Sequence, residues 1–306
     1  MQTNTLQDNI VRGQATPQRD LHSHESTIIP TGSLESEEDV NKAVEIIKDG
    51  GVAVIQFRGV FGVFVRADHA EAVEKALARV KDGEVRPMVA MMDSRSFLEA
   101  VDTTKVHPNL QALTSNPQEY VDRLGGIAIV AAPIKKEFAK HIPDTLLSNK
   151  KGVYKMLNLD PSGNPYMVGF ISKLVDSGIL FVGISSLNQS GREEITQFDK
   201  ALDFVGSKAD VQILLTDPLA NDNIHGSFTI IDLETCALVR EGHIPSWIIE
   251  EALEVKLNRS KTKKENYPHF AGFNEFKDKQ AHIDHPRQWR QMALSIAGNV
   301  NHQAKV

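Results

Sequence analysis

The segment from Ile179 to Gly191 constrains the fold of this chain more than any other. It reads Ile-Leu-Phe-Val-Gly-Ile-Ser-Ser-Leu-Asn-Gln-Ser-Gly, an apolar run long enough for a buried strand that ends abruptly in small and polar residues. In open α/β sheets, the carboxyl ends of strands are where ligands bind, and uncharged donors on a tight turn suit phosphate or carboxylate oxygens. A polar turn that caps a following helix is the alternative. The candidate donors are Ser185, Ser186, Asn188 and Ser190.

Strand-like and helix-like patterns alternate along the rest of the chain. Ser36 opens an amphipathic helix with an acidic first turn, and Asp49-Gly50-Gly51 ends it. Apolar runs predict buried strands at 52–55, 60–65, 88–92 and 125–132, and a closing hairpin at 229–233 and 237–240. Helical spacing predicts helices over 70–80, 94–101, 116–124 and 166–176, and the segment 143–153 is expected to be an exposed connection. The alternation predicts an α/β fold: a twisted mixed sheet flanked by helices, with an open ligand cleft at the strand ends.

The chain divides into three predicted parts. Residues 1–33 are polar and aperiodic, which is typical of a flexible leader, and residues 34–246 form the main domain. In the tail, 247–306, a helix at 248–257 precedes a basic run and several aromatics. Such a mixture can form a single-strand nucleic-acid platform, but we expect a strap that packs on the core. His282, Asp284 and His285 lack a third imidazole at suitable spacing, so we expect no metal site there.

Composition narrows the functional classes. The 306 residues include a single cysteine, Cys236, which excludes a disulfide framework and a thiolate metal cluster. Because Cys236 lies in an apolar run, we expect it to be buried. There is no secretion signal and no apolar run of membrane-spanning length, so we expect a cytoplasmic protein with no membrane partner. The net charge of −6 argues against autonomous nucleic-acid binding, so a role touching RNA would run through a small-molecule product or a local basic patch.

Four segments carry a family resemblance. Ser185-Ser-Leu-Asn-Gln-Ser-Gly191 is similar to a Thr-Ser-Ala-Asn-x-Ser-Gly signature, and the segment 50–62 is similar to a Gly-Gly strand with a Pro-Thr-Asp-Thr turn. Arg79-Val-Lys81 followed by Arg86-Pro-Met resembles a Lys-x-Arg motif before a Pro-Leu strand opening. The segments 227–233 and 238–242 resemble Ser-Thr-Val-Val-Asp and Arg-x-Gly. In this order and with these gaps, they resemble the YrdC-like family, the threonylcarbamoyl-adenylate synthases.

The resemblance implies a YrdC-like nucleotide-binding domain and a specific reaction. The amino group of L-threonine captures bicarbonate, the carbamate oxygen attacks the α-phosphate of ATP, and pyrophosphate leaves; Mg²⁺ accompanies the ATP. The product, threonylcarbamoyl-adenylate, serves the modification of a tRNA adenosine. The implied catalytic residues are Arg79, Lys81, Ser186 and Asn188. The implied nucleotide-binding residues are Ser185, Ser186, Asn188, Ser190, Thr229 and Arg240. The implied substrate pocket contains Arg58, Phe61 and Lys155.

The departures from the family concern its amino-acid pocket. Gln56-Phe-Arg-Gly59 stands where the family has Pro-Thr-Asp-Thr, Phe61 replaces its tyrosine, and the cation pair is reversed. Three functions remain open. The first is a threonylcarbamoyl-adenylate synthase. The second is an ATP-using relative that activates another carbamate or carboxylate, with an acidic group of its substrate facing Arg58. The third is a non-catalytic paralogue that binds nucleotide or RNA.

Overall fold

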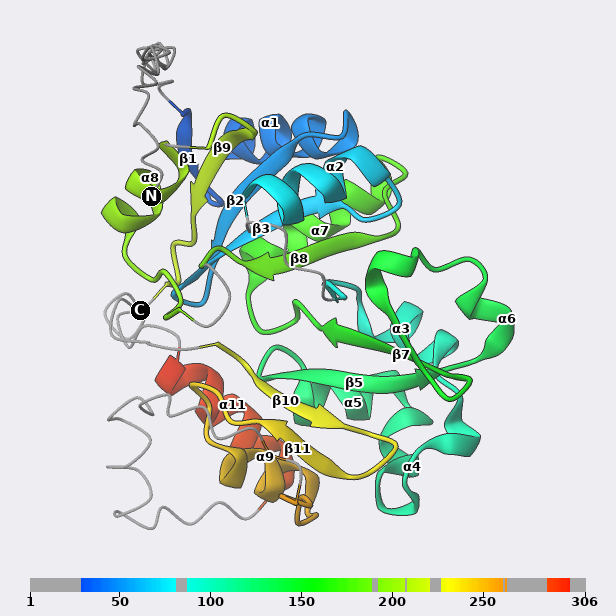
Figure 1. Cartoon of the computed structure of the whole chain (residues 1–306). Helices are drawn as coiled ribbons and strands as arrows, with labels where there is room; N and C mark the ends of the chain where they lie inside the picture. The colour runs from blue at the N-terminus through cyan, green and yellow to red at the C-terminus, as the bar shows by residue number, and fades with distance from the viewer. Residues whose placement is uncertain are drawn as a thin grey trace, which may run out of the picture.

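The computed structural model of the chain describes residues 29–80, 87–188, 192–206, 208–220, 227–260, 262 and 285–297. Within them, an 11-stranded mixed sheet runs in the order β1-β9-β2-β3-β8-β4-β7-β5-β10-β11, with β6 paired to β7 (Figure 1). The strands are β1 (Thr31–Ser33), β2 (Val52–Phe57), β3 (Val60–Arg66), β4 (Val89–Ala90), β5 (Ala128–Ile134), β6 (Leu147–Lys150), β7 (Val153–Leu159), β8 (Val182–Ser186), β9 (Val211–Thr216), β10 (Thr229–Asp232) and β11 (Ala237–Arg240). The expected α/β fold with a twisted mixed sheet is confirmed.

The sheet consists of two halves joined through a very short strand. One half contains β1, β9, β2, β3 and β8, and the other contains β7, β5, β10 and β11. Between them, the two residues of β4 pair antiparallel with β8 and parallel with β7. Figure 1 shows the two halves one above the other, with β4 between them. The strand predicted at 88–92 is therefore only two residues long. It connects the two halves of the sheet by pairing with one strand of each.

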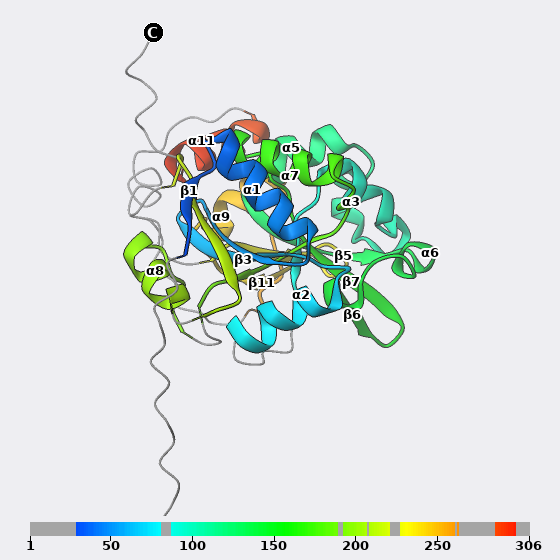
Figure 2. The ribbon, with the colours of Figure 1, turned by 90° about the horizontal axis from the view of Figure 1, so that it is seen from above.

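Helices cover both faces of the sheet (Figure 2). The expected helix at Ser36 is α1 (Glu37–Lys48), and the Ser36 side chain accepts a hydrogen bond from the Asp39 backbone N–H, a typical N-cap. Val40, Val44 and Ile47 form its buried stripe. The other longer helices are α2 (Ala70–Glu74), continued by a π-helical segment (Lys75–Val80), α3 (Ser94–Ala100), α5 (Pro117–Leu124), α7 (Pro165–Asp176), α8 (Phe198–Gly206), α9 (Ser246–Leu253) and α11 (Pro286–Ala297). Shorter helical turns are Thr103–Lys105, Pro108–Leu110, α4 (Gln111–Thr114), α6 (Lys136–Ala139) and Asp144–Leu146.

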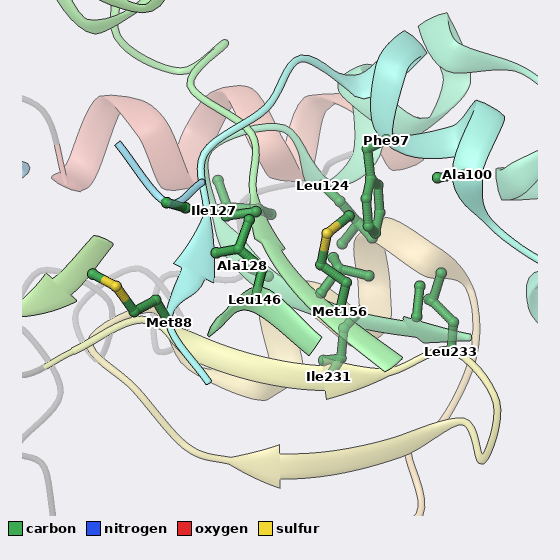
Figure 3. Close-up of a cluster of buried hydrophobic side chains, with 14 of the residues drawn as sticks. Met88, Phe97, Ala100, Leu124, Ile127, Ala128, Leu146, Met156, Ile231 and Leu233 are labelled. Atoms are coloured by element: carbon green, nitrogen blue, oxygen red, sulfur yellow. The ribbon is translucent and has the colours of Figure 1, made fainter. Parts of the chain in front are cut away.

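The hydrophobic core has two parts, one on each side of the sheet. Helices α1 and α7 pack on one face, where Ile47, Phe64 and Phe170 are buried together. In the other part, side chains from β7, β10, α3 and α5 converge, and Figure 3 labels Phe97, Leu124, Met156 and Ile231 among them. The alternation of strand residues between these two parts explains why β2 and β5 are near-continuous apolar runs.

The structure corrects two sequence expectations about local elements. The segment 143–153 is not simply an exposed connection, because β6 pairs with β7 and Leu146 is fully buried. Its polar composition reflects an edge strand rather than a loop. The sheet also begins before residue 34, since β1 pairs in parallel with β9 inside the segment expected to be a leader.

The C-terminal segment packs against the second half of the sheet. Ile248, Ile249 and Leu253 of α9 are buried in the core, and α11 lies against both α9 and α5. Trp247 of α9 meets Trp289 of α11 edge to face, with ring centroids 5.7 Å apart. The sequence predicted that the basic run and the aromatics of the tail pack on the core. Most of these residues lie outside the described part of the chain, as do His282 and Asp284.

Candidate functional site

A cavity of about 200 Å³ lies between the two halves of the sheet. Most of its wall is apolar and comes from strands of both halves and from segments next to them: Phe57, Val60, Gly62, Phe64, Leu77, Pro87, Met88, Val89, Ile129, Leu157, Leu159, Ile184, Phe228 and Ile230. Gly62 lies on β3 opposite Ser186, and a Cβ added there would approach the Ser185 carbonyl oxygen to 3.3 Å. The glycine therefore leaves room beside the polar end of β8.

The polar part of the wall consists of three serines and one arginine: Ser185, Ser186, Ser227 and Arg240. The two serines of β8 are half-buried at the strand end, where the apolar run from residue 179 was predicted to stop. Arg240 Nη2 donates to Ser227 Oγ at 2.5 Å and to the Phe228 carbonyl oxygen at 2.9 Å. Among the described residues of the lining, Arg240 is the cation, so negative charge in the cavity would be stabilised from its side.

A β-bulge aims Arg240 into the cavity. In the antiparallel pair of β10 and β11, Ile231 lies opposite Leu238, but Ile230 lies opposite Arg240, so the register shifts by one residue. Without the shift, Leu238 and Arg240 would point to the same face because side chains alternate along a strand. Leu238 is buried in the core, whereas Arg240 shares the cavity face with Ile230. Extra residues of this kind often redirect side chains beside binding sites.

Two aromatic rings close one side of the cavity. Phe57, the last residue of β2, stacks on Phe228, which precedes β10, with centroids 5.5 Å apart and planes inclined by 21°. The buried His243 ring meets Phe228 edge to face at 4.8 Å, and its backbone N–H donates to the Ser227 carbonyl oxygen at 2.8 Å. His243 thus fixes the position of Ser227 and Phe228 in the cavity wall through one ring contact and one backbone hydrogen bond.

Of the predicted nucleotide-binding residues, Ser185, Ser186 and Arg240 line the cavity, whereas Thr229 does not. The Thr229 side chain is 0% exposed; its hydroxyl donates to the Ile244 carbonyl oxygen and accepts from the Gly242 backbone N–H at 2.9 Å. Thr229 points into the core because it alternates with Phe228 and Ile230 along the strand. Its contacts hold the turn after Arg240 rather than a ligand in this cavity.

Asn188 and Phe61 also lie outside the cavity wall. The Asn188 side-chain amide donates to the Arg192 carbonyl oxygen at 2.5 Å and so connects the end of β8 to residue 192. Phe61 is fully buried in the core, where its backbone N–H donates to the Ile195 carbonyl oxygen and its carbonyl oxygen accepts from Leu187. Both residues position the end of β8 without lining the cavity.

Lys155 points to the same face of β7 as Leu157 and Leu159, which line the cavity, but the structure places it farther along the strand. Its amino group pairs with Asp232 at 2.6 Å and with Glu234 at 2.5 Å. Burial opposes the lysine's charge, but these two carboxylates outweigh it and raise the pKa of Lys155. Lys155 is therefore held in a local ion-pair cluster on the cavity face.

Arg58 is buried beside the cavity rather than in its wall. It occupies the two-residue turn between β2 and β3 with a φ of +51°, followed by Gly59 at +84°. Its backbone N–H donates to Asp217 Oδ2 at 3.1 Å, its Nη2 donates to the Gly163 carbonyl oxygen, and its Cζ lies 6.0 Å from the centroid of the Phe57 ring. Burial lowers the pKa of Arg58 to about 10, with Asp217 opposing and Arg290 adding to this effect.

Three predicted residues cannot be placed at the site. Lys81 and Ser190 lie outside the described residues, and of Arg79 only the backbone is described, at the end of the segment whose Leu77 lines the cavity. The sequence interpretation did not single out Ser227 and Phe228 as members of the wall. Ser227 opens the motif in which Thr229 was chosen, and the hydroxyl of this motif that lines the cavity is that of Ser227.

Metal and membrane features can be stated only for the described part of the chain. There, no cluster of three or more histidine, cysteine, aspartate or glutamate side chains is arranged to hold a metal ion. None of the helices in the same residues combines the length and apolar character needed to cross a bilayer.

Comparison with known proteins identifies the fold. No protein-family model matches the chain, and no curated protein sequence matches it either. Among solved structures, a variant of P. abyssi Sua5 with two alanine substitutions aligns with a TM-score of 0.57 and 18% identity over 76% of this chain. The alignment spans 65% of that Sua5 chain, slightly less than two thirds.

Two further structures agree with this match. P. abyssi Sua5 in complex with L-threonine has a TM-score of 0.55 and 15% identity, with 88% of each chain covered. E. coli YciO has a TM-score of 0.51 and 19% identity, covering 70% of this chain and 94% of its own. Together with the mixed sheet described above, these matches show that the chain has the fold of Sua5 and YciO.

Proposed function

We propose that the chain binds ATP in this cavity and uses it to adenylate a small acid, as the threonylcarbamoyl-adenylate synthases do. The observation that carries the proposal is the single polar wall, where Ser185, Ser186, Ser227 and Arg240 face an otherwise apolar cavity. Apolar and aromatic walls suit a purine, and hydroxyls next to a guanidinium suit phosphate oxygens. The fold shared with Sua5 supports the same function.

The chemistry requires positioning and charge stabilisation rather than a protein nucleophile. A carbamate or carboxylate oxygen attacks the α-phosphorus, the bond to the bridging oxygen breaks, and pyrophosphate leaves with the electron pair. Arg240 would stabilise charge on the phosphate oxygens, and the two serines of β8 would orient them. The described lining contains no carboxylate, so Mg²⁺ would be coordinated by the phosphate oxygens of ATP and not by these residues.

The geometry favours an acid other than threonine as the second substrate. Phe57, the last residue of β2, stands where the family has a threonine, and it closes the cavity by stacking on Phe228. A site built to hydrogen-bond a hydroxyl discriminates strongly for it, and aromatic rings cannot replace those partners. The proposed substrate class is therefore a small carbamate or carboxylic acid, with L-threonine as the reference compound.

Calorimetry with ATP and Mg²⁺ tests the nucleotide part of the proposal. We expect Arg240→Ala to weaken ATP binding by about 10- to 100-fold, since hydrogen bonds to charged groups contribute about 1.5–3 kcal/mol. Arg66→Ala is the matched control, because Arg66 leaves β3 to pair with Asp68 away from the cavity wall. Absence of measurable ATP binding by the unmodified chain would refute the proposal.

Pyrophosphate release tests the reaction. The chain is incubated with ATP, Mg²⁺ and bicarbonate across a panel of amino acids and small carboxylic acids that includes threonine. Acid-dependent release that Arg240→Ala abolishes supports an adenylating enzyme. ATP binding without release for any acid in the panel would instead favour the non-catalytic nucleotide-binding alternative.

A further inference from the structure

The Arg58 guanidinium is an unusual buried group. The residue is 3% exposed, and within the part of the chain that the structure describes neither its Nε nor its Nη1 has a hydrogen-bond partner. In that part, the guanidinium donates from Nη2 alone, to the Gly163 carbonyl oxygen. Burying a cation without matching acceptors costs several kcal/mol, so such groups are normally paired with anions.

The neighbouring carboxylates do not supply the missing acceptors. Asp217 accepts from the Arg58 backbone N–H and from the Asn164 side chain at 2.6 Å through Oδ2, and from the Leu219 N–H at 2.9 Å through Oδ1. Asp160 accepts from the Ser162 N–H at 2.8 Å. Asp217 lowers the electrostatic cost of the buried arginine, but neither carboxylate accepts a hydrogen bond from its Nε or Nη1.

A second arginine reaches the same turn from the C-terminal helix. Arg290 of α11 donates from Nε to the Gly125 carbonyl oxygen at 2.7 Å and from Nη2 to the Ser162 carbonyl oxygen at 3.3 Å. It is close enough to Arg58 to lower the pKa of that guanidinium by repulsion. Two guanidiniums therefore lie around the Ser162–Gly163 turn, and arginine is the side chain that most often recognises carboxylate and phosphate groups.

The backbone at Arg58 adds an independent argument. Position 58 requires a positive φ, for which glycine and asparagine are the usual residues, yet an arginine occupies it. Such strain persists where the surrounding structure holds it and often marks a functional residue. Here the Asp217 carboxylate holds the backbone N–H, so the side chain is directed inward toward Gly163.

We propose that Arg58 and Arg290 form a buried subsite for an oxyanion, the carboxylate or phosphate of a small molecule, and that its binding stabilises the docking of α11. Leu294 of α11 lies over the same turn, since its Cδ2 would be 2.9 Å from a Cβ added at Gly163. The anion therefore links the β2–β3 turn to the C-terminal helix. This subsite does not depend on ATP binding in the cavity.

The chain contains its own reporter for this docking. Its two tryptophans, Trp247 and Trp289, contact each other across the α9–α11 interface, and Trp289 precedes Arg290. Titration of the full chain with inorganic phosphate, and separately with succinate, is followed by tryptophan fluorescence at constant ionic strength. We expect a saturable fluorescence change and a rise in Tm of about 2–3 °C at ten times the dissociation constant. Whichever anion saturates at lower concentration identifies the preferred class.

Variants separate this subsite from other anion sites. Arg58→Met should abolish both responses, and Arg290→Met should weaken the apparent affinity at least tenfold. Arg240→Ala, which alters the cavity, and Arg66→Met, which alters an exposed ion pair, should retain them. Without added anion, the Tm of Arg58→Met should equal or exceed that of the unmodified chain, because an uncompensated buried charge is removed.

The opposite results would overturn the proposal. They are no saturable response of the unmodified chain to either anion, an equal response in Arg58→Met, or a response that Arg240→Ala alone removes. If Arg58→Met does not fold, the affinity of Arg290→Met decides: an unchanged affinity refutes the subsite.

Discussion

Replacing Thr229 by valine distinguishes a structural hydroxyl from a ligand-binding one. The side chain is fully buried, and its hydroxyl satisfies both the Ile244 carbonyl oxygen and the Gly242 N–H. Valine has nearly the same shape but leaves both backbone groups without this partner. A buried polar group that loses its partner costs about 1–3 kcal/mol, so two such groups predict a loss of about 2–6 kcal/mol in the free energy of unfolding.

Urea unfolding measures this loss directly. With an m-value of about 3 kcal/mol per M, the transition midpoint of Thr229→Val should fall by about 0.7–2 M at unchanged m. Thr104→Val is the control, since Thr104 is exposed and its hydroxyl donates to Asp102 at 2.6 Å; there we expect less than about 0.5 kcal/mol. In the folded variant, the affinity for ATP should stay within about twofold. An unchanged unfolding midpoint together with a loss of ATP affinity would refute this reasoning and restore Thr229 to the nucleotide site.

Two further predictions concern stability. Burial raises the pKa of Asp160 above its ordinary value of 3.8. Between these two pKa values, the folded chain therefore binds more protons at this group than the unfolded chain. The stabilising contribution of the protonated group is lost as pH rises through the folded pKa. Asp160→Asn should therefore gain stability relative to the unmodified chain as pH increases from about 4 to 7 in urea titrations; a constant difference contradicts this. Gly126→Ala should cost at least about 2 kcal/mol more than Gly152→Ala. Both glycines have positive φ, but a Cβ at Gly126 would lie 2.8 Å from the Gly163 backbone, whereas at Gly152 it meets nothing within 4 Å. Equal losses in the free energy of unfolding for the two variants would show that backbone strain at positive φ, and not the clash of the added Cβ, determines the cost of both substitutions.

Most local structure could be predicted from the sequence. The cap at Ser36, the glycine stop after α1 and the proline-started helices α5 and α7 all depend on residues within a few positions of one another. The burial of Cys236 followed from its apolar neighbours. Strand β4 was overestimated because its pairing is decided by β7 and β8, which come from distant parts of the chain.

The site was predicted only in part, for a reason that Thr229 and Arg240 illustrate. The motif around residues 227–242 was identified, but local periodicity does not show that Thr229 faces the core or that a register shift turns Arg240 toward the cavity. Likewise, no local pattern indicates that Phe57 stacks on Phe228.

The sequence by itself determined most of the helices and the strands β2, β3, β5, β8, β10 and β11, because apolar periodicity, caps and turn residues act over short distances. It also determined that a strand ends in Ser185 and Ser186. The tertiary structure alone decided which side chains share the cavity and that α11 brings Arg290 to the turn beside Arg58. Those outcomes depend on strand register and on packing between segments that are distant in the sequence. Such contacts form only in the folded chain, so no local sequence pattern shows them.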